Sequence, residues 1–145
     1  MSAFLVKHVT YGKDKRDPLA SLITTIKPQP YSLTNKGEYS KKYAIGCPIY
    51  VVESRRGNKK GDKTTYWLGY KYIAHKVLLS SDPMFDYKII ATDPPIGVYF
   101  STPKQISNIP TVVWLKNCGQ GIVEIKNSDH IDCFDKIFSA GSSSL

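Results

Sequence analysis

The chain has 145 residues and a formal net charge of +8, from 20 lysines and arginines against 12 aspartates and glutamates. Hydrophobic residues make up 41% of it and charged residues 22%, enough apolar side chain for a packed core, which excludes a disordered chain. The length suits a single domain. No run approaches the roughly 18 apolar residues of a membrane span. The three cysteines indicate reduced thiols, and we expect a cytoplasmic protein, or a nuclear one in a eukaryote.

Lysine carries most of the positive charge, and tyrosine is the most frequent aromatic residue, with 10 tyrosines beside 5 phenylalanines and 2 tryptophans. A small, basic, tyrosine-rich domain indicates a polyanionic partner, of which nucleic acid is the first candidate. The alternative is a lysine-rich protein whose charge serves only its solubility.

The first third of the chain predicts a strand, a helix and an irregular segment. Residues 4–9 predict a short opening strand. Asp17 followed by Pro18 is typical of a helix start, with Asp17 as the N-cap and Pro18 in the first turn. Apolar residues then recur at helical spacing over 19–26. Residues 27–46 are polar, contain two prolines and are expected to be irregular.

The middle of the chain predicts a long antiparallel hairpin. Residues 49–52 are β-branched and aromatic, and residues 64–79 form a longer run of the same kind. The segment between them is rich in glycine and charge, as hairpin loops are. Gly69 within the second strand predicts a bulge or a tight bend, as found where a sheet closes into a barrel.

The last third predicts short strands and two helices. The predicted strands are 87–91, 98–100, 112–115 and 122–125, and the predicted helices are 103–108 and one that begins at Ser128. The absence of a regular alternation of strands and helices argues against a doubly wound parallel sheet. We therefore expect an α+β fold, a small and mostly antiparallel β-barrel flanked by short helices. The domain should cover residues 1–140, with 141–145 as a linker or tail.

The loop of the predicted hairpin concentrates the positive charge. Five cations stand against Asp62 alone, a balance of +4 over nine residues: Arg55, Arg56, Lys59, Lys60 and Lys63. Cations on a hairpin loop reach phosphate at low steric cost, so these five are predicted to bind phosphate. The alternative is a solvated loop that deters pairing at the sheet edge.

The aromatic residues divide into strand and loop positions. Period two places Tyr66, Tyr70 and Tyr72 on one face of their strand, unless Gly69 shifts the register. Tyr31 falls in a segment expected to be a loop, as does Phe85. Loop aromatics of this kind stack on an unstacked base, build an aromatic cage around a methyl group, or anchor the loop onto the core.

Enzymatic signatures are sparse. Walker A, GxGxxG, HExxH and GxSxG stretches are absent from the sequence. Glu124 and Lys126 form a Glu-x-Lys pair of the kind that supplies a magnesium ligand and a cation in nucleases, with an upstream acid such as Asp86 or Asp93. The ordinary alternation of apolar and charged side chains along a strand accounts for the same residues. Cys118, His130 and Cys133 are better interpreted as ordinary buried residues than as zinc ligands, because the chain has no CxxC pair.

The order of these elements resembles the EVE/YTH branch of the PUA-like superfamily. The matching segments are the opening FLVK of residues 4–7, GCPIYVVES of 46–54, the YWLGY of 66–70 followed by SDP of 81–83, and QGIVEI of 120–125. The resemblance spans nearly the whole chain. It implies a PUA-like barrel that holds a methylated or otherwise modified base, flipped into an aromatic pocket.

The resemblance also implies roles for individual residues. Six positions correspond to the base pocket and its rim: Tyr31, Phe85, Tyr87, Ser54, Lys7 and His8. Domains of this branch act as readers rather than catalysts, so it implies a non-enzymatic protein without cofactor or metal. It also implies use as the specificity module of a modification-dependent restriction system, with a fused or associated nuclease or NTPase, and favours DNA slightly over RNA. The alternatives are the Glu124/Lys126 nuclease and a peptide-binding module.

Overall fold

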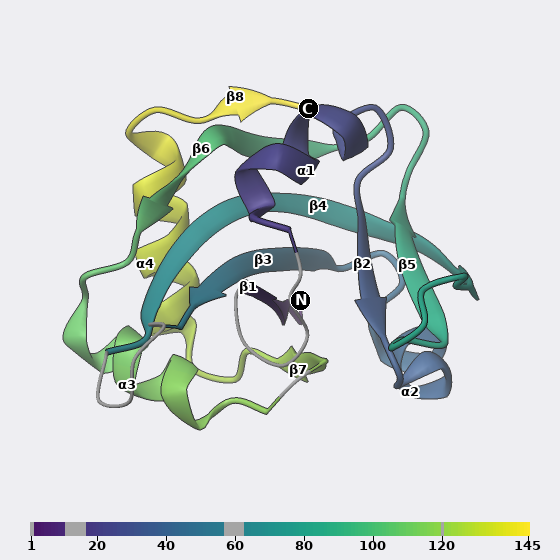
Figure 1. Ribbon diagram of the computed structural model, residues 1–145, viewed down its shortest axis with the longest axis horizontal. Helices are drawn as coiled ribbons and strands as arrows, with labels where there is room; N and C mark the ends of the chain where they lie inside the picture. The colour runs from purple at the N-terminus through teal and green to yellow at the C-terminus, as the bar shows by residue number, and fades with distance from the viewer. Residues whose placement is uncertain (1, 11–16, 57–62, 120) are drawn as a thin grey trace.

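The computed structural model describes residues 2–10, 17–56, 63–119 and 121–145. Within these ranges the chain forms an α+β fold in which a mixed sheet curls into a half-barrel, flanked by four short helices (Figure 1). All strand pairings but one are antiparallel; β1 and β3 run parallel. The predicted α+β class and the mostly antiparallel, barrel-like sheet are therefore confirmed.

The strands follow the order β2-β5-β4-β3-β1-β7. In addition, β6 pairs with the first half of β4, and β8 pairs with β6. The strands are β1 Phe4–Thr10, β2 Tyr31–Thr34, β3 Pro48–Arg55, β4 Thr65–Leu79, β5 Tyr87–Ala91, β6 Gly97–Gln105, β7 Ile122–Glu124 and β8 Ser143–Ser144. The helices are α1 Leu19–Ile26, α2 Gly37–Tyr43, α3 Ile109–Asn117 and α4 Ser128–Ser139.

The sheet buries a hydrophobic cluster on each face. Phe4, Val6 and Val51 pack with α1 on one face. Leu5 and Tyr50, their strand neighbours, pack with α4 on the other. Because successive side chains of a strand point to opposite faces, β1 and β3 contribute to both clusters. Figure 1 shows α1 and α4 on opposite sides of the curled sheet.

The long hairpin of β3 and β4 forms as predicted, and Gly69 lies at its irregularity. The pairing shifts register between Val51 and Val52 of β3, opposite Gly69, and again where β6 joins β4. As a result Tyr66 packs in the α4-side cluster, whereas Tyr70 packs in the α1-side cluster. Tyr70 and Tyr72 share a face as period two predicts, and the register shift at Gly69, the expected exception, places Tyr66 on the other face.

The start of α1 differs from the sequence prediction in its cap. Pro18 occupies the N-cap position, where it supplies no side-chain cap hydrogen bond. Instead the backbone N–H of Leu19 donates a 2.7 Å hydrogen bond to Oε2 of Glu53, a fully buried residue of β3. A carboxylate at a helix N-terminus is favoured by the orphan N–H groups and the helix dipole. A strand distant in sequence thus supplies the cap predicted for Asp17.

Three further predictions of local structure are wrong. The segment 27–46 contains β2 and α2 rather than irregular chain. The segment 103–108 is not a helix, because its first three residues are the end of β6. Residues 112–115 lie in α3 rather than in a strand. The last case has a local cause, since the side chain of Asn108 accepts the N–H of Thr111 and Pro110 lies in the first turn.

The C-terminal residues 141–145 belong to the fold rather than forming a tail. Ser143 and Ser144 pair with β6, and the N–H of Leu145 donates to the carbonyl of Gly97 at 3.1 Å. The Leu145 side chain packs against the α1-side cluster. The expected domain end at residue 140 is therefore too early.

Candidate functional site

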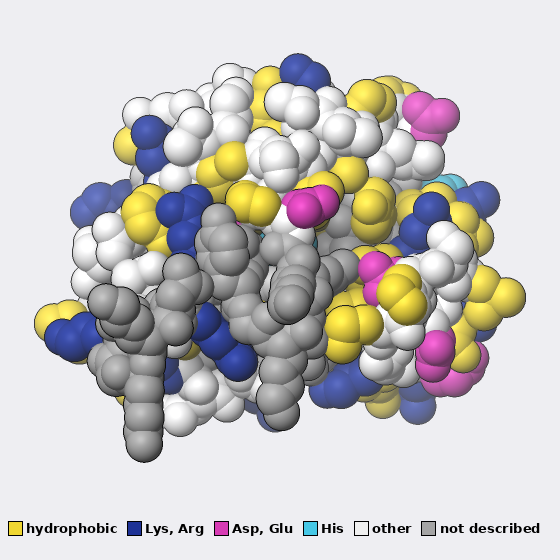
Figure 2. All heavy atoms as spheres, in the orientation of Figure 1, with side chains coloured by type: hydrophobic (Ala, Val, Ile, Leu, Met, Phe, Trp, Pro, Cys, Tyr) yellow, Lys and Arg dark blue, Asp and Glu magenta, His cyan; other side chains and the backbone are white. Residues whose placement is uncertain are grey.

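A basic cavity of about 650 Å³ lies where β1, β3 and α3 end and β4 begins. Its described lining consists of Lys7, Val9, Ser54, Arg56, Lys63, Thr64, Tyr66, Lys116, Cys118 and Gly119. Figure 2 shows Lys and Arg side chains distributed over this face, some of them at the lower left, the region where α3 lies in Figure 1.

Strand register builds the floor of this basic cavity. Val9 lies opposite Ser54 in the parallel β1–β3 pair, and Ser54 lies opposite Tyr66 in the β3–β4 hairpin. All three residues are nearly buried, with Ser54 and Tyr66 each 4% exposed. Arg56, Lys63 and Lys116 are exposed and form the rim. The lining therefore combines buried residues that carry hydroxyl groups with exposed positive charge.

Lys7 is a cation held in place inside the cavity. Its Nζ donates one hydrogen bond to the carbonyl oxygen of Leu115, at 3.1 Å, and another to that of Cys118. These carbonyls lie at the C-terminal end of α3, where the helix dipole favours a positive charge. Burial lowers the pKa of Lys7, and the thiol of Cys118 opposes that shift while Arg56 adds to it. An anion entering the cavity would counter this desolvation.

Neutral donors complement the cations. Burial raises the pKa of the Tyr66 hydroxyl and of the Cys118 thiol, so both keep their protons near neutral pH. Among the described lining residues there are four cations and no aspartate or glutamate. Hydroxyls and cations are the donor groups that an anion with several acceptor oxygens, such as phosphate, requires.

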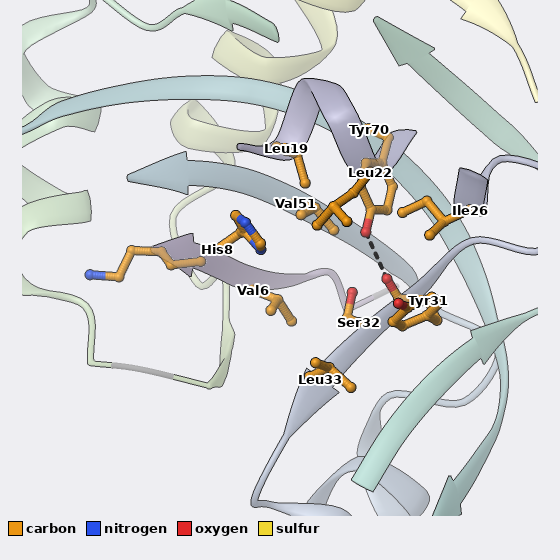
Figure 3. Close-up of a pocket in the computed structure, with 11 residues that line it drawn as sticks. Val6, His8, Leu19, Leu22, Ile26, Tyr31, Ser32, Leu33, Val51 and Tyr70 are labelled. Atoms are coloured by element: carbon orange, nitrogen blue, oxygen red, sulfur yellow. Dashed lines mark hydrogen bonds between the residues drawn. The ribbon is translucent and has the colours of Figure 1, made fainter. Parts of the chain in front are cut away.

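A second, much smaller pocket lies on the opposite face of the sheet, between α1, β1 and β2 (Figure 3). Tyr31, Ser32 and His8 line it together with apolar residues, and its volume is about 40 Å³. The Tyr70 hydroxyl donates to the carbonyl of Tyr31 at 2.6 Å. The buried Ser32 hydroxyl lies near that of Tyr72 without reaching hydrogen-bonding geometry. This space accommodates a few water molecules but not a nucleobase.

The residues predicted to bind a base are divided among three places. Lys7 and Ser54 line the basic cavity. Tyr31 and His8 line the small pocket, to which Lys7 also contributes. Phe85 and Tyr87 line neither of these two.

Phe85 and Tyr87 lie at the far end of the β2–β5 pair from Tyr31. Tyr31 pairs with Ile90, whereas Thr34, at the other end of β2, pairs with Tyr87. The Tyr87 ring covers Gly37, and Lys41 lies over it at 5.9 Å from its centroid. The described structure therefore does not assemble Tyr31 and Phe85 into one aromatic cage.

The residues predicted to bind phosphate are also divided. Arg56 and Lys63 line the basic cavity, whereas Lys59 and Lys60 lie outside the described residues. Arg55 is engaged within the fold: its Nε donates to Oε1 of Glu53 at 2.6 Å, and its guanidinium lies 4.0 Å from the Trp67 ring centroid.

Sequence reasoning missed the contribution of α3 to the basic cavity. Lys116 lies in the last turn of this helix, and Cys118 and Gly119 follow it. The signal that could have found them is the helix start formed by Asn108 and Pro110, which predicts a helix over the residues that follow. Tyr66, interpreted only as a core or pairing residue, also lines the cavity.

The nuclease candidates Glu124 and Lys126 lie on and just after β7, outside the lining of the basic cavity. In the part of the chain that the structure describes, no group of three or more His, Cys, Asp or Glu side chains is arranged to hold a metal ion. His130 instead shares a 2.9 Å hydrogen bond with Thr111 and stacks on Trp114.

A scan against models of protein families finds none that matches this chain, and a search of curated proteins finds no similar sequence. Among the described helices, none has the length and apolar character needed to cross a membrane.

Proposed function

We propose that this chain is a nucleic-acid-binding domain that holds phosphate in the basic cavity. The observation that carries the proposal is the convergence of Lys7, Arg56, Lys63 and Lys116 around a buried floor of hydroxyl groups. These cations come from three separate parts of the chain, namely β1, the β3–β4 loop and α3, so the charged loop alone does not account for their convergence. Phosphate contacts of this kind supply affinity without sequence preference and make binding depend strongly on salt.

The proposal extends to a modified base, as the resemblance to EVE/YTH-type PUA-like domains implies. A cavity of about 650 Å³ has the size of ordinary ligand sites and can accept a nucleotide. The Tyr31 pocket, at about 40 Å³, can accept only a small substituent in its present shape. A single methyl group contributes about 1 kcal/mol by buried area, so the expected preference for the modified base is roughly tenfold.

The test is a binding panel of methylated and unmethylated DNA and RNA, each at two salt concentrations. The variant Arg56→Gln/Lys63→Gln should weaken binding to every oligonucleotide and reduce the salt slope by about 1.5, because each phosphate contact contributes 0.7 to 0.9. Lys136→Gln removes an exposed charge from α4 away from the cavity and should change nothing.

The panel separates the two parts of the proposal. Binding that is absent, or that does not respond to salt, would refute the nucleic-acid function and favour a peptide-binding module. Salt-dependent binding that is equal for methylated and unmethylated strands would refute only the modified-base part. Magnesium-dependent cleavage that Glu124→Gln abolishes would establish the nuclease instead.

A further inference from the structure

The charge of the basic cavity exceeds what an internal phosphate of a nucleic-acid strand supplies. Four cations line it among the described residues, without an acidic side chain. An internal phosphodiester carries one negative charge, whereas a phosphomonoester carries about 1.5 to 2 at pH 7 and has three terminal oxygens. The lining is therefore better matched to the second group.

The shape of the cavity points the same way. Its floor residues Val9, Ser54 and Tyr66 are all less than 8% exposed, whereas its rim residues are exposed. A strand that continues in both directions from an internal phosphate passes across such a rim. A terminal phosphate can enter and reach the floor hydroxyls.

Lys7 provides a donor at depth. Two of the three protons of its ammonium group are directed at the carbonyls of Leu115 and Cys118, which fixes Nζ in position. The third proton remains available to a ligand. A cation held by two neutral carbonyls keeps its full charge for that ligand, and the partly buried setting strengthens the attraction.

We infer that the basic cavity binds a phosphomonoester group, at the end of a nucleic-acid strand or on a mononucleotide. The inference rests on the proposed nucleic-acid function and specifies which phosphate the site selects. Lys7 contacts it from within, Arg56, Lys63 and Lys116 surround it at the rim, and the Ser54 and Tyr66 hydroxyls lie beneath it.

The experiment compares one single-stranded oligonucleotide in three forms: 5′-phosphate, 3′-phosphate and hydroxyl at both ends. Fluorescence anisotropy at 0.15 M salt should show at least one phosphorylated form binding roughly tenfold tighter than the hydroxyl form, through one added charge-assisted contact. Lys116→Gln, at the exposed end of α3, should reduce this ratio to below about threefold. The matched Lys136→Gln, in the last turn of α4, should preserve it.

Lys7→Gln should also remove the preference, provided that circular dichroism shows an intact fold; Lys116→Gln tests the same site if it does not. Competition with adenosine monophosphate identifies the source of the group. Displacement at concentrations similar to those of the phosphorylated strand indicates a mononucleotide site, and displacement only at far higher concentrations indicates a strand end.

The outcomes distinguish this inference from the function on which it rests. Tight, salt-dependent binding that is equal for the phosphorylated and hydroxyl forms would overturn the phosphomonoester site and leave nucleic-acid binding in place. Failure of all three forms to bind would overturn both. A phosphate preference that Lys116→Gln leaves unchanged would also overturn the assignment to this cavity.

Discussion

The buried carboxylate of Glu53 should be a main determinant of stability. It accepts the N–H of Leu19 at 2.7 Å and that of Arg55 Nε at 2.6 Å, and its side chain is fully buried whereas that of Arg55 is 31% exposed. Glu53→Gln keeps an acceptor for one donor but loses the charge, which should cost about 2 kcal/mol. Arg55→Met keeps the stem over Trp67 but removes the guanidinium hydrogen bond to the buried carboxylate, which should cost about 2 kcal/mol.

Urea denaturation at pH 7, followed by circular dichroism, measures both free energies of unfolding. The exposed pair of Glu38 and Lys41 provides the control, since Glu38→Gln should change the free energy by less than about 0.5 kcal/mol. The reasoning is refuted if Glu53→Gln and Arg55→Met are as neutral as Glu38→Gln.

Three further predictions concern other parts of the fold. Burial lowers the pKa of His130 below 6.5, so as the pH falls the unfolded chain binds a proton at this residue before the folded chain does. The free energy of unfolding should therefore decrease as the pH is lowered past about 6.5, and it should decrease less in His130→Gln. Equal decreases in both proteins between pH 7 and pH 5 would contradict this. Gly97→Ala should cost about 2 to 4 kcal/mol, because φ is +154° and a Cβ would collide with the backbone of β4, whereas Gly141→Ala, with open space, should be neutral in the same urea titration. Deleting residues 142–145 should cost about 1 to 2 kcal/mol through loss of β8 and Leu145 packing, and an unchanged midpoint would mean that this strand contributes nothing.

Local patterns predicted the strands that are long or apolar. The β3–β4 hairpin, its irregularity at Gly69 and the β5 strand all follow from runs of β-branched and aromatic residues. Where the sequence failed, tertiary pairing outweighs local preference. Pro103 predicts a helix start, yet it lies in β6. It falls in the irregular stretch of β6 between the residue that pairs with Tyr70 and the one that pairs with Leu68. The N–H that proline lacks therefore costs no hydrogen bond between strands.

The candidate site was only partly predictable for a related reason. Lys7, Ser54, Arg56 and Lys63 could be selected from the sequence, but their meeting point could not, because it depends on the parallel register of β1 and β3. Lys116 was missed because a Val-Val-Trp-Leu run reads as a strand until the Asn108 cap is considered.

The parallel pairing of β1 with β3 has a consequence for how the protein assembles. Parallel neighbours cannot be joined by a tight turn, and here α1, β2 and α2 lie between them in the chain. Closing so long a segment is slow compared with forming the β3–β4 hairpin, which alone brings Ser54 beside Tyr66. Lys7 is placed only when β1 pairs with β3, so partly folded chains lack the completed basic cavity. A ligand of this cavity would therefore stabilise the finished fold selectively, and its affinity could be measured from the rise in unfolding midpoint.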